Sequence, residues 1–186
     1  MKILELFCGL GGWSKGFHDI FPEAEFYGID IKDYGYSYNF IEADLNDWEP
    51  DQEYDIVLAS PPCTEFSLSK LWGCGTQDER IGLDLIWRTF YLIEKINPKF
   101  WILENVKRLS NFLPPPAEII AYNRHKQGKA AYLWSNIGKL GFLENSIDFR
   151  AQDSSAGKST CKNKAEMALI PLPLAHEAAR RIHARM

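Results

Sequence analysis

Short apolar runs alternate along this chain with helical or irregular stretches. The runs are rich in β-branched and aromatic residues and too short for helices, so each predicts a buried strand. Strands are expected over residues 3–7, 25–29, 40–42, 55–59, 100–103 and 131–134. Apolar residues at helical spacing predict a helix over 80–97, and prolines at its start favour another over 172–185. This alternation predicts an α/β fold whose mostly parallel sheet has helices on both faces.

Chain length and cysteine content narrow the class of protein. The 186 residues suit a single domain, 1–186, with a substantial core. Cysteines stand at positions 8, 63, 74 and 161, without CxxC pairs or histidines at ligand spacing, so neither a zinc site nor a disulfide framework is indicated. The N-terminus enters a strand directly and no apolar run approaches bilayer length. We therefore expect reduced thiols, a cytoplasmic location, and neither a signal peptide nor a membrane span.

Charge is distributed unevenly along the chain. Residues 1–60 hold three Lys or Arg against thirteen Asp or Glu, whereas residues 61–186 hold eighteen against twelve. The second part could receive a polyanion, although such a basic stretch also occurs as an ordinary solvated loop. The basic side chains concerned are Lys107, Arg108, Arg124, Lys126, Lys129 and Lys139.

The predicted strand over residues 55–59 leads into Ser60-Pro61-Pro62-Cys63. The two prolines fix φ and force Ser60 into an extended conformation, so the chain leaves the sheet along a stiff path with Cys63 at the carboxyl edge. Open α/β sheets bind ligands at that edge. An arbitrary cysteine is most often a small buried hydrophobe, but this position favours a nucleophile.

A glycine-rich turn, Cys8-Gly9-Leu10-Gly11-Gly12, follows the first predicted strand and opens a short helix. Its backbone N–H groups can approach a ligand at the positive end of that helix. Ser14 stands where a dinucleotide fingerprint needs its third glycine. NAD is therefore disfavoured, and a smaller nucleoside-type ligand fits better.

Acidic residues follow three of the predicted strands. Asp30 lies about twenty residues beyond the glycines, where a carboxylate can accept both ribose hydroxyls. Asp44, after the strand over residues 40–42, suits an exocyclic amine. Glu104 directly follows the strand over residues 100–103. If that strand neighbours the one over 55–59, Cys63 and Glu104 lie side by side. The cleft then holds one nucleophile and one acid.

Three motifs together resemble the cytosine-C5 DNA methyltransferases. They are Glu5-Leu6-Phe7-Cys8-Gly9-Leu10-Gly11-Gly12, Ser60-Pro61-Pro62-Cys63 with Phe66-Ser67, and Glu104-Asn105-Val106. The resemblance implies a class I, Rossmann-like fold with a seven-stranded sheet. It also implies S-adenosylmethionine as cofactor, DNA as substrate, and an enzyme of restriction–modification or phage type.

The resemblance assigns roles by position. Cys63 would be the nucleophile, Glu104 its partner on the base, and Arg124 the candidate for cytosine O2, ahead of Arg150. Phe7 would stack on the adenine, and Pro62 would line the pocket. The implied cofactor-binding set is Glu5, Phe7, Gly9, Leu10, Gly11, Gly12, Asp30, Ile31, Asp44, Leu45 and Pro62.

The chemistry explains why these residue types are needed. Carbon 5 of cytosine is too weak a nucleophile to take a methyl group until a thiolate adds at carbon 6. A thiol with a pKa of about 8.5 is mostly protonated at neutral pH, so the site must lower that pKa or remove the proton during attack. Glu104 can donate to cytosine N3 if burial among apolar neighbours raises its pKa. The base must be flipped out of a duplex or arrive unpaired.

Several positions depart from the family pattern. Thr64 stands where glutamine usually follows the cysteine, and only Ile170-Pro171 fits the C-terminal motif. The target-recognition domain has room only within residues 107–164, so we expect recognition to be short, relaxed, or supplied by a partner chain or homodimer. Methylation of RNA such as tRNA, exocyclic amino methylation, and a catalytically inactive DNA-binding regulator stay open as alternatives.

Overall fold

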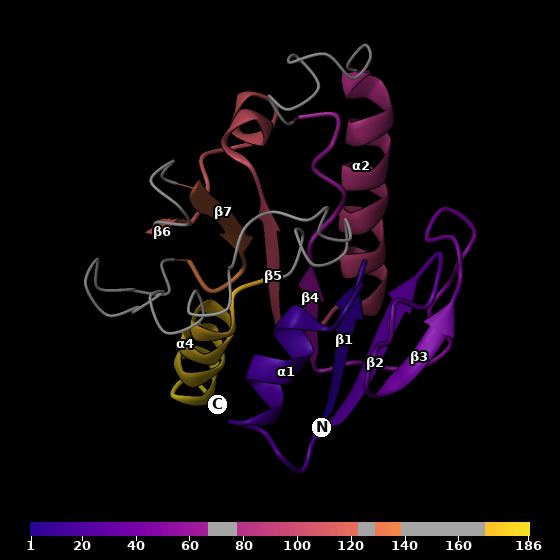
Figure 1. Cartoon of the computed structure of the whole chain (residues 1–186), viewed down its shortest axis with the longest axis vertical. Coiled ribbons are helices and arrows are strands. Elements are labelled where there is room, and N and C mark those ends of the chain that lie inside the picture. The colour runs from indigo at the N-terminus through magenta and orange to yellow at the C-terminus, as the bar shows by residue number, and fades with distance from the viewer. Residues whose placement is uncertain (67–77, 123–128, 139–169) are drawn as a thin grey trace, which may run out of the picture.

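The computed structural model describes residues 1–66, 78–122, 129–138 and 170–186 (Figure 1). Its centre is a seven-stranded sheet in the order β3-β2-β1-β4-β5-β7-β6. The strands are β1 (Lys2–Leu6), β2 (Glu25–Asp30), β3 (Asn39–Glu42), β4 (Ile56–Ala59), β5 (Phe100–Asn105), β6 (Glu118–Tyr122) and β7 (Lys129–Ser135). β1 to β5 are parallel, and β7 runs antiparallel to both β5 and β6. The predicted mostly parallel sheet is confirmed.

β6 has no counterpart among the predicted strands. It is an edge strand that pairs with β7, and it alternates between exposed Ile119 and buried Ile120. A short strand of this kind owes its structure to non-local pairing, which local propensity does not reveal. Both β6 and β7 lie within residues 107–164, so part of the segment expected for target recognition belongs to the central sheet.

Helices cover both faces of the sheet, as predicted (Figure 1). α1 (Gly12–His18) and α4 (Leu172–His183) contribute to one core cluster, and α2 (Glu79–Ile96) contributes to the other. A short 3-10 helix, η2 (Lys107–Asn111), follows β5. None of the helices in the described ranges is both long and apolar enough to cross a membrane.

Small residues allow α1 and α4 to pack closely. A Cβ added at Gly16 would lie 2.4 Å from the Cβ of Ala175, and one at Gly12 would lie 2.7 Å from the backbone nitrogen of Ile170. Contacts advance in the same direction along both segments, so α4 runs parallel to α1. Because α1 leads away from the carboxyl edge of the sheet, the C-terminal end of α4 lies toward the amino-terminal edge (Figure 1).

The connection from β2 to β3 contains no helix. A parallel crossover usually takes about a dozen or more residues and a helix, but residues 31–38 make this one as an irregular loop. Aromatic rings cover the sheet beside it: Tyr38 lies 5.1 Å from Phe26 and 5.6 Å from Tyr36 between ring centroids. His18 of α1 adds a contact of 5.5 Å to Tyr38. Aromatic packing thus replaces a crossover helix here.

Strand order reverses between β1 and β4, which are neighbours although β2 and β3 intervene in the sequence. Ligands of α/β sheets bind outside the carboxyl ends of the strands at such a reversal. Leu6 of β1 lies opposite Ala59 of β4, which in turn lies opposite Leu103 of β5. The glycine-rich turn, the Cys63 segment and Glu104 therefore emerge at the same edge.

Candidate active site

The turn that leaves β1 has left-handed backbone conformations at Phe7 (φ 58°), Gly9 (φ 49°) and Gly11 (φ 75°). Glycine adopts such angles freely, but a phenylalanine pays about 1–2 kcal/mol for them. Strain of this kind gathers at functional sites, where the surrounding structure maintains it. Phe7 is half-buried and is turned out of the strand at the point where the sequence predicts an adenine contact.

Glu5 lies buried at the end of β1, with 2% of its surface exposed. Its carboxylate accepts the backbone N–H of Trp13 at 3.2 Å, the backbone N–H of Ser14 at 3.0 Å and the Ser14 hydroxyl at 2.5 Å. These groups belong to the first turn of α1, whose positive end suits a carboxylate. Burial raises the pKa of Glu5 to about 7, an effect partly offset by the hydrogen bonds from Ser14.

Asp30 ends β2 beside the glycine-rich turn. Its Oδ2 accepts the N–H of Gly9 at 2.9 Å, and its Oδ1 accepts the N–H of Ile31 at 2.8 Å. Burial raises the pKa of this carboxyl, against the opposing effect of those N–H donors. Since each carboxylate oxygen has further acceptor capacity, Asp30 can still receive hydroxyl groups of a ligand.

The remaining residues predicted around the adenine have different surroundings. Ile31 is 63% exposed, whereas Leu45 is buried in the core with 4% exposed. Asp44 is exposed, and its Oδ1 accepts the N–H of Asn46 at 2.9 Å. Leu10 is half-buried in the turn. Among these side chains, Ile31 and Asp44 are the ones that solvent reaches most freely.

Hydrogen bonds from two neighbouring elements hold the segment that follows β4. The indole Nε1 of Trp13 donates to Ser60 Oγ at 3.0 Å, and the amide of Asn105 donates to the carbonyl of Pro61 at 3.0 Å. The two prolines therefore leave the sheet along a path held from both sides. The sequence motif contained Asn105, but nothing in the local sequence indicated that its amide reaches Pro61.

Cys63 lies at the end of this path. It carries a thiol rather than a disulfide and is half-buried, so packing does not seal it. Its carbonyl accepts the N–H of Phe66 at 3.0 Å, which closes a turn. Phe66 is buried beneath α2, where a Cβ added at Gly82 would lie 2.7 Å from its ring. The turn after Cys63 is thus anchored in the core, while Pro62 before it is exposed.

Glu104 is half-buried near the end of β5, opposite Leu133 of β7. Because Ala59 pairs with Leu103 and Pro61 is bonded to Asn105, the Cys63 segment runs alongside the end of β5. The structure thus brings the predicted nucleophile and the predicted acid to adjacent strand ends. Arg124 and Arg150 lie outside the described residues.

Cys8 provides a contrast with Cys63. It is buried in the glycine-rich turn with 3% exposed. Burial raises its pKa strongly, and the nearby carboxylates of Glu5 and Asp30 raise it further. A thiol in this setting keeps its proton and is a poor nucleophile.

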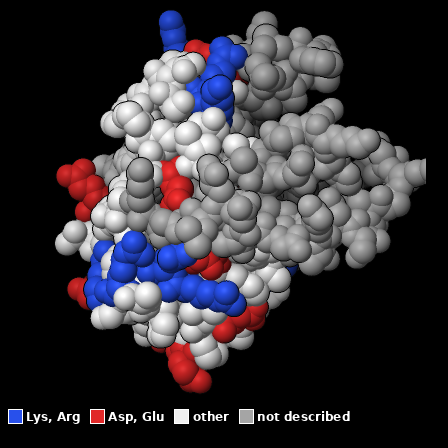
Figure 2. All heavy atoms as spheres, turned by 90° about the vertical axis from the view of Figure 1, so that its left-hand side faces the viewer, with Lys and Arg blue, Asp and Glu red and all other residues white. Residues whose placement is uncertain are grey.

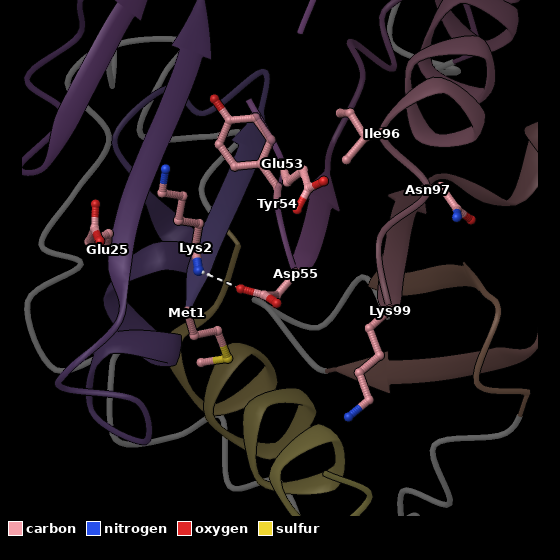
Figure 3. A pocket seen from close by; sticks show the side chains of 9 residues that line it. All are labelled: Met1, Lys2, Glu25, Glu53, Tyr54, Asp55, Ile96, Asn97 and Lys99. Carbon is pink, nitrogen blue, oxygen red and sulfur yellow. Dashed lines mark hydrogen bonds between the residues drawn. The ribbon is translucent and has the colours of Figure 1, made fainter. Parts of the chain in front are cut away.

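A cavity of about 690 Å³ lies at the opposite, amino-terminal edge of the sheet (Figure 3). Its lining comes from Met1, Lys2, Glu25, Glu53, Tyr54, Asp55, Ile96, Asn97 and Lys99. None of the predicted site residues contributes to it. Within the described ranges, no group of His, Cys, Asp and Glu side chains is arranged to hold a metal ion.

Sequence reasoning missed Ser14 and Tyr36, which are buried and support the glycine-rich turn through Glu5. The Tyr36 hydroxyl lies 2.6 Å from Ser14 Oγ, which connects it to Glu5. Ser14 was noticed only as a missing glycine. Tyr36 gave no signal, because its contact with the glycine-rich turn joins segments that are distant in the sequence.

Residues 1–113 of this chain match the family model described as C-5 cytosine-specific DNA methylase. Type II methyltransferase M.HaeII of Haemophilus aegyptius is 36% identical over 121 residues, which cover 59% of this chain and 36% of that protein. A "Probable DNA (cytosine-5)-methyltransferase" of Frog virus 3 (isolate Goorha) is 28% identical over 182 residues, 88% of this chain and 78% of that protein. The chain thus spans little more than a third of M.HaeII.

Among solved structures, the methyltransferase EhMeth of Entamoeba histolytica is similar with a TM-score of 0.49 and 17% identity, over 80% of this chain and 55% of that one. A DNMT2 mutant of Spodoptera frugiperda is similar with a TM-score of 0.44 and 22% identity, over 59% of this chain and 37% of that one.

Proposed function

Because this chain belongs to the C-5 cytosine-specific DNA methylase family, we propose that it transfers a methyl group from S-adenosylmethionine to carbon 5 of cytosine in DNA. The observation that carries the proposal is the arrangement of Cys63 and Glu104 at the ends of neighbouring parallel strands, next to the glycine-rich turn. The proposed nucleophile, the proposed acid and the glycine-rich turn thus lie at one edge of the sheet.

The residues of the turn fit S-adenosylmethionine. Gly9 has φ +49° and nothing within 4 Å of the place where a Cβ would stand, so its backbone can approach a ligand closely. The carboxylates of Glu5 and Asp30 supply negative charge near this turn for a ligand that carries ammonium and sulfonium groups. Phe7 offers an aromatic ring to the adenine. When bound, the cofactor supplies the methyl group.

Cys63 and Glu104 divide the remaining chemistry. The Cys63 thiolate adds to carbon 6 of cytosine, which makes carbon 5 nucleophilic. Once carbon 5 carries the methyl group, it loses its proton and the bond between Cys63 Sγ and carbon 6 breaks, which restores the ring and the thiolate. Glu104 donates a proton or hydrogen bond at N3, so that negative charge does not accumulate on the ring. The hydrogen bond between Asn105 and Pro61 keeps the two segments in register during this addition. Cys8, whose proton is held by its burial, takes no part as a nucleophile.

Recognition of the target sequence needs more than the described part of the chain. β6 and β7 are occupied in the central sheet, and the chain spans little more than a third of M.HaeII. We propose that residues between β7 and α4, a partner chain or a second copy of this chain complete the recognition surface. The target base is flipped out of the duplex toward Cys63 or arrives unpaired.

Covalent trapping on DNA that contains 5-fluorocytosine tests the proposal. We expect an adduct that survives denaturing electrophoresis, requires S-adenosylmethionine, and maps by mass spectrometry to the peptide with Cys63. Cys63→Ser should abolish it, and matched DNA with ordinary cytosine should give none. A wild-type chain that never forms the adduct while it binds DNA would favour the regulator instead. Bisulfite sequencing after expression in a methylation-free host would then show whether carbon 5 is the methylated position.

A further inference from the structure

Tyr36 is a buried residue of the loop from β2 to β3, with 7% of its surface exposed. Its ring fills the space above two glycines. A Cβ added at Gly28 would lie 2.5 Å from the ring, and one at Gly11 would lie 3.0 Å from it. Gly28 precedes Asp30 in β2, and Gly11 is the N-cap residue of α1. One side chain therefore contacts both segments that the proposed function assigns to cofactor binding.

The Tyr36 hydroxyl continues into a chain of hydrogen bonds. It lies 2.6 Å from Ser14 Oγ, and Ser14 Oγ lies 2.5 Å from Glu5 Oε2. A serine hydroxyl has a single proton. When Glu5 is ionised it can only accept, so Ser14 then donates to Glu5 and Tyr36 donates to Ser14. Burial and the nearby Glu5 raise the pKa of Tyr36, which keeps this donor protonated.

This series of hydrogen bonds ends at the first turn of α1. Glu5 accepts the N–H groups of Trp13 and Ser14, which have no partner within the helix. The loop that carries Tyr36 has no helix of its own to hold it, because residues 31–38 cross from β2 to β3 as an irregular segment. Tyr36 thus contacts the end of β2 and the glycine-rich turn from this loop, in addition to the direct hydrogen bond between Asp30 and Gly9.

We propose that Tyr36 is a positioning residue, which holds the glycine-rich turn and the end of β2 in the conformation that receives S-adenosylmethionine. This inference rests on the proposed function for the identity of the ligand. Tyr36 acts through Ser14 and Glu5 and through its ring on the two glycines. Loss of its hydroxyl should release the turn without removing a group that contacts the reacting atoms.

The test compares Tyr36→Phe with Tyr38→Phe. Both variants lose one phenol hydroxyl from the same aromatic cluster, but only the first hydroxyl belongs to the chain to Ser14. By calorimetry with S-adenosylhomocysteine, Tyr36→Phe should weaken binding about three- to tenfold, the effect of one hydrogen bond, and Tyr38→Phe should not change it measurably. At saturating cofactor, kcat of Tyr36→Phe should match the wild type, so that the loss appears in KM.

Amide hydrogen exchange of the cofactor-free protein supplies a measurement that needs neither ligand nor activity. The amides of Trp13 and Ser14 should exchange faster in Tyr36→Phe than in the wild type or Tyr38→Phe. Ser14→Ala should loosen the turn at least as much, because it also removes the bond to Glu5, and adding Tyr36→Phe to it should have no further effect. Unchanged exchange and unchanged affinity in Tyr36→Phe would overturn the inference. A wild type that binds no S-adenosylhomocysteine would instead overturn the proposed cofactor, while exchange would still decide the role of Tyr36.

Discussion

The side-chain amide of Asn105 donates a 3.0 Å hydrogen bond to the carbonyl of Pro61, across the gap between β5 and the segment that follows β4. Asn105 is 1% exposed, and its Oδ1 also accepts the N–H of Val106 at 2.9 Å. One amide thus connects the residue next to Glu104 with the path that leads to Cys63. The distance between the proposed nucleophile and the proposed acid depends on this connection.

Asn105→Ala should therefore reduce catalysis more than stability. A buried carbonyl left without its donor costs about 1–3 kcal/mol of unfolding free energy, and the freed Cys63 segment should slow adduct formation on 5-fluorocytosine DNA by roughly 10- to 100-fold, the cost of small misplacements. Urea unfolding and the trapping rate measure the two effects.

Asn136→Ala is the matched control for Asn105. The Asn136 amide accepts the N–H of Trp101 at 3.0 Å and donates to the carbonyl of Lys99 at 3.0 Å, so it too makes two hydrogen bonds, at the other end of β5. Because Asn136 and these bonds are exposed, its loss should lower stability less than the loss of Asn105 and leave the trapping rate unchanged. Equal slowing in both variants would contradict a special role for Asn105.

Glu5 should make stability depend on pH in a direction unusual for a carboxyl. Its pKa rises from 4.5 to about 7 on folding, chiefly because it is buried. The unfolded chain ionises first as pH increases, so this group's contribution is fully present below pH 4.5 and is lost as the pH rises to about 7. The loss amounts to about 3 kcal/mol at most. Negative charge beside the glycine-rich turn is thus maintained at some cost in stability.

Glu5→Gln isolates that contribution. Glutamine does not titrate, so the unfolding free energy of the variant minus that of the wild type should increase as the pH is raised from 4.5 to 7. Chemical unfolding at several pH values gives this difference, in which the other carboxyls cancel. A difference that stays flat over this range would show that Glu5 is not shifted as its burial indicates.

Gly16→Ala should weaken the packing of α4 against α1. The new Cβ would lie 2.4 Å from the Cβ of Ala175, and crowding of this kind costs about 1–3 kcal/mol. Lys15→Ala, at an exposed position on the same helix, should have little effect. The double variant Gly16→Ala with Ala175→Gly should recover part of the loss, because it removes the closest contact. Thermal unfolding would contradict the account if the single variant were as stable as the wild type.

DNA binding should weaken strongly with salt and depend on the cations at the carboxyl edge. Figure 2 shows the side of the molecule that lies at the left of Figure 1. Basic side chains lie near the top of this side, at the level of η2, and in a band lower down, at the level of α4. Lys107 begins η2 just beyond the carboxyl end of β5, whereas Lys99 precedes β5 at the amino-terminal edge of the sheet. Lys107→Ala should reduce the slope of log K against log salt by about one, and Lys99→Ala should not. Fluorescence anisotropy measures both, and equal slopes would contradict this placement.

The sequence predicted the proposed site best where the conformation of a segment depends on its own residues. Prolines after β4 stop the strand wherever it lies, and the glycines after β1 permit the left-handed turn without outside help. The sequence left open whether the strands that lead to Cys63 and Glu104 are neighbours, and the pairing of β4 with β5 decided it. β6, Ser14 and Tyr36 were missed because their structure comes from partners distant in the chain.

By itself the sequence determined the α-helices and, apart from β6, the strands in the described part of the α/β fold, together with the edge of the sheet at which the proposed site lies, because periodicity, proline and glycine act over a few neighbouring residues. Only the tertiary structure decided that Tyr36 and Glu5 both bond to Ser14 beside the glycine-rich turn, and that the Asn105 amide donates to the carbonyl of Pro61. It also decided that Cys8 is buried while Cys63 is partly exposed. Each of these depends on hydrogen bonds or burial between segments far apart in the chain. Their free energy arises only when the sheet is assembled.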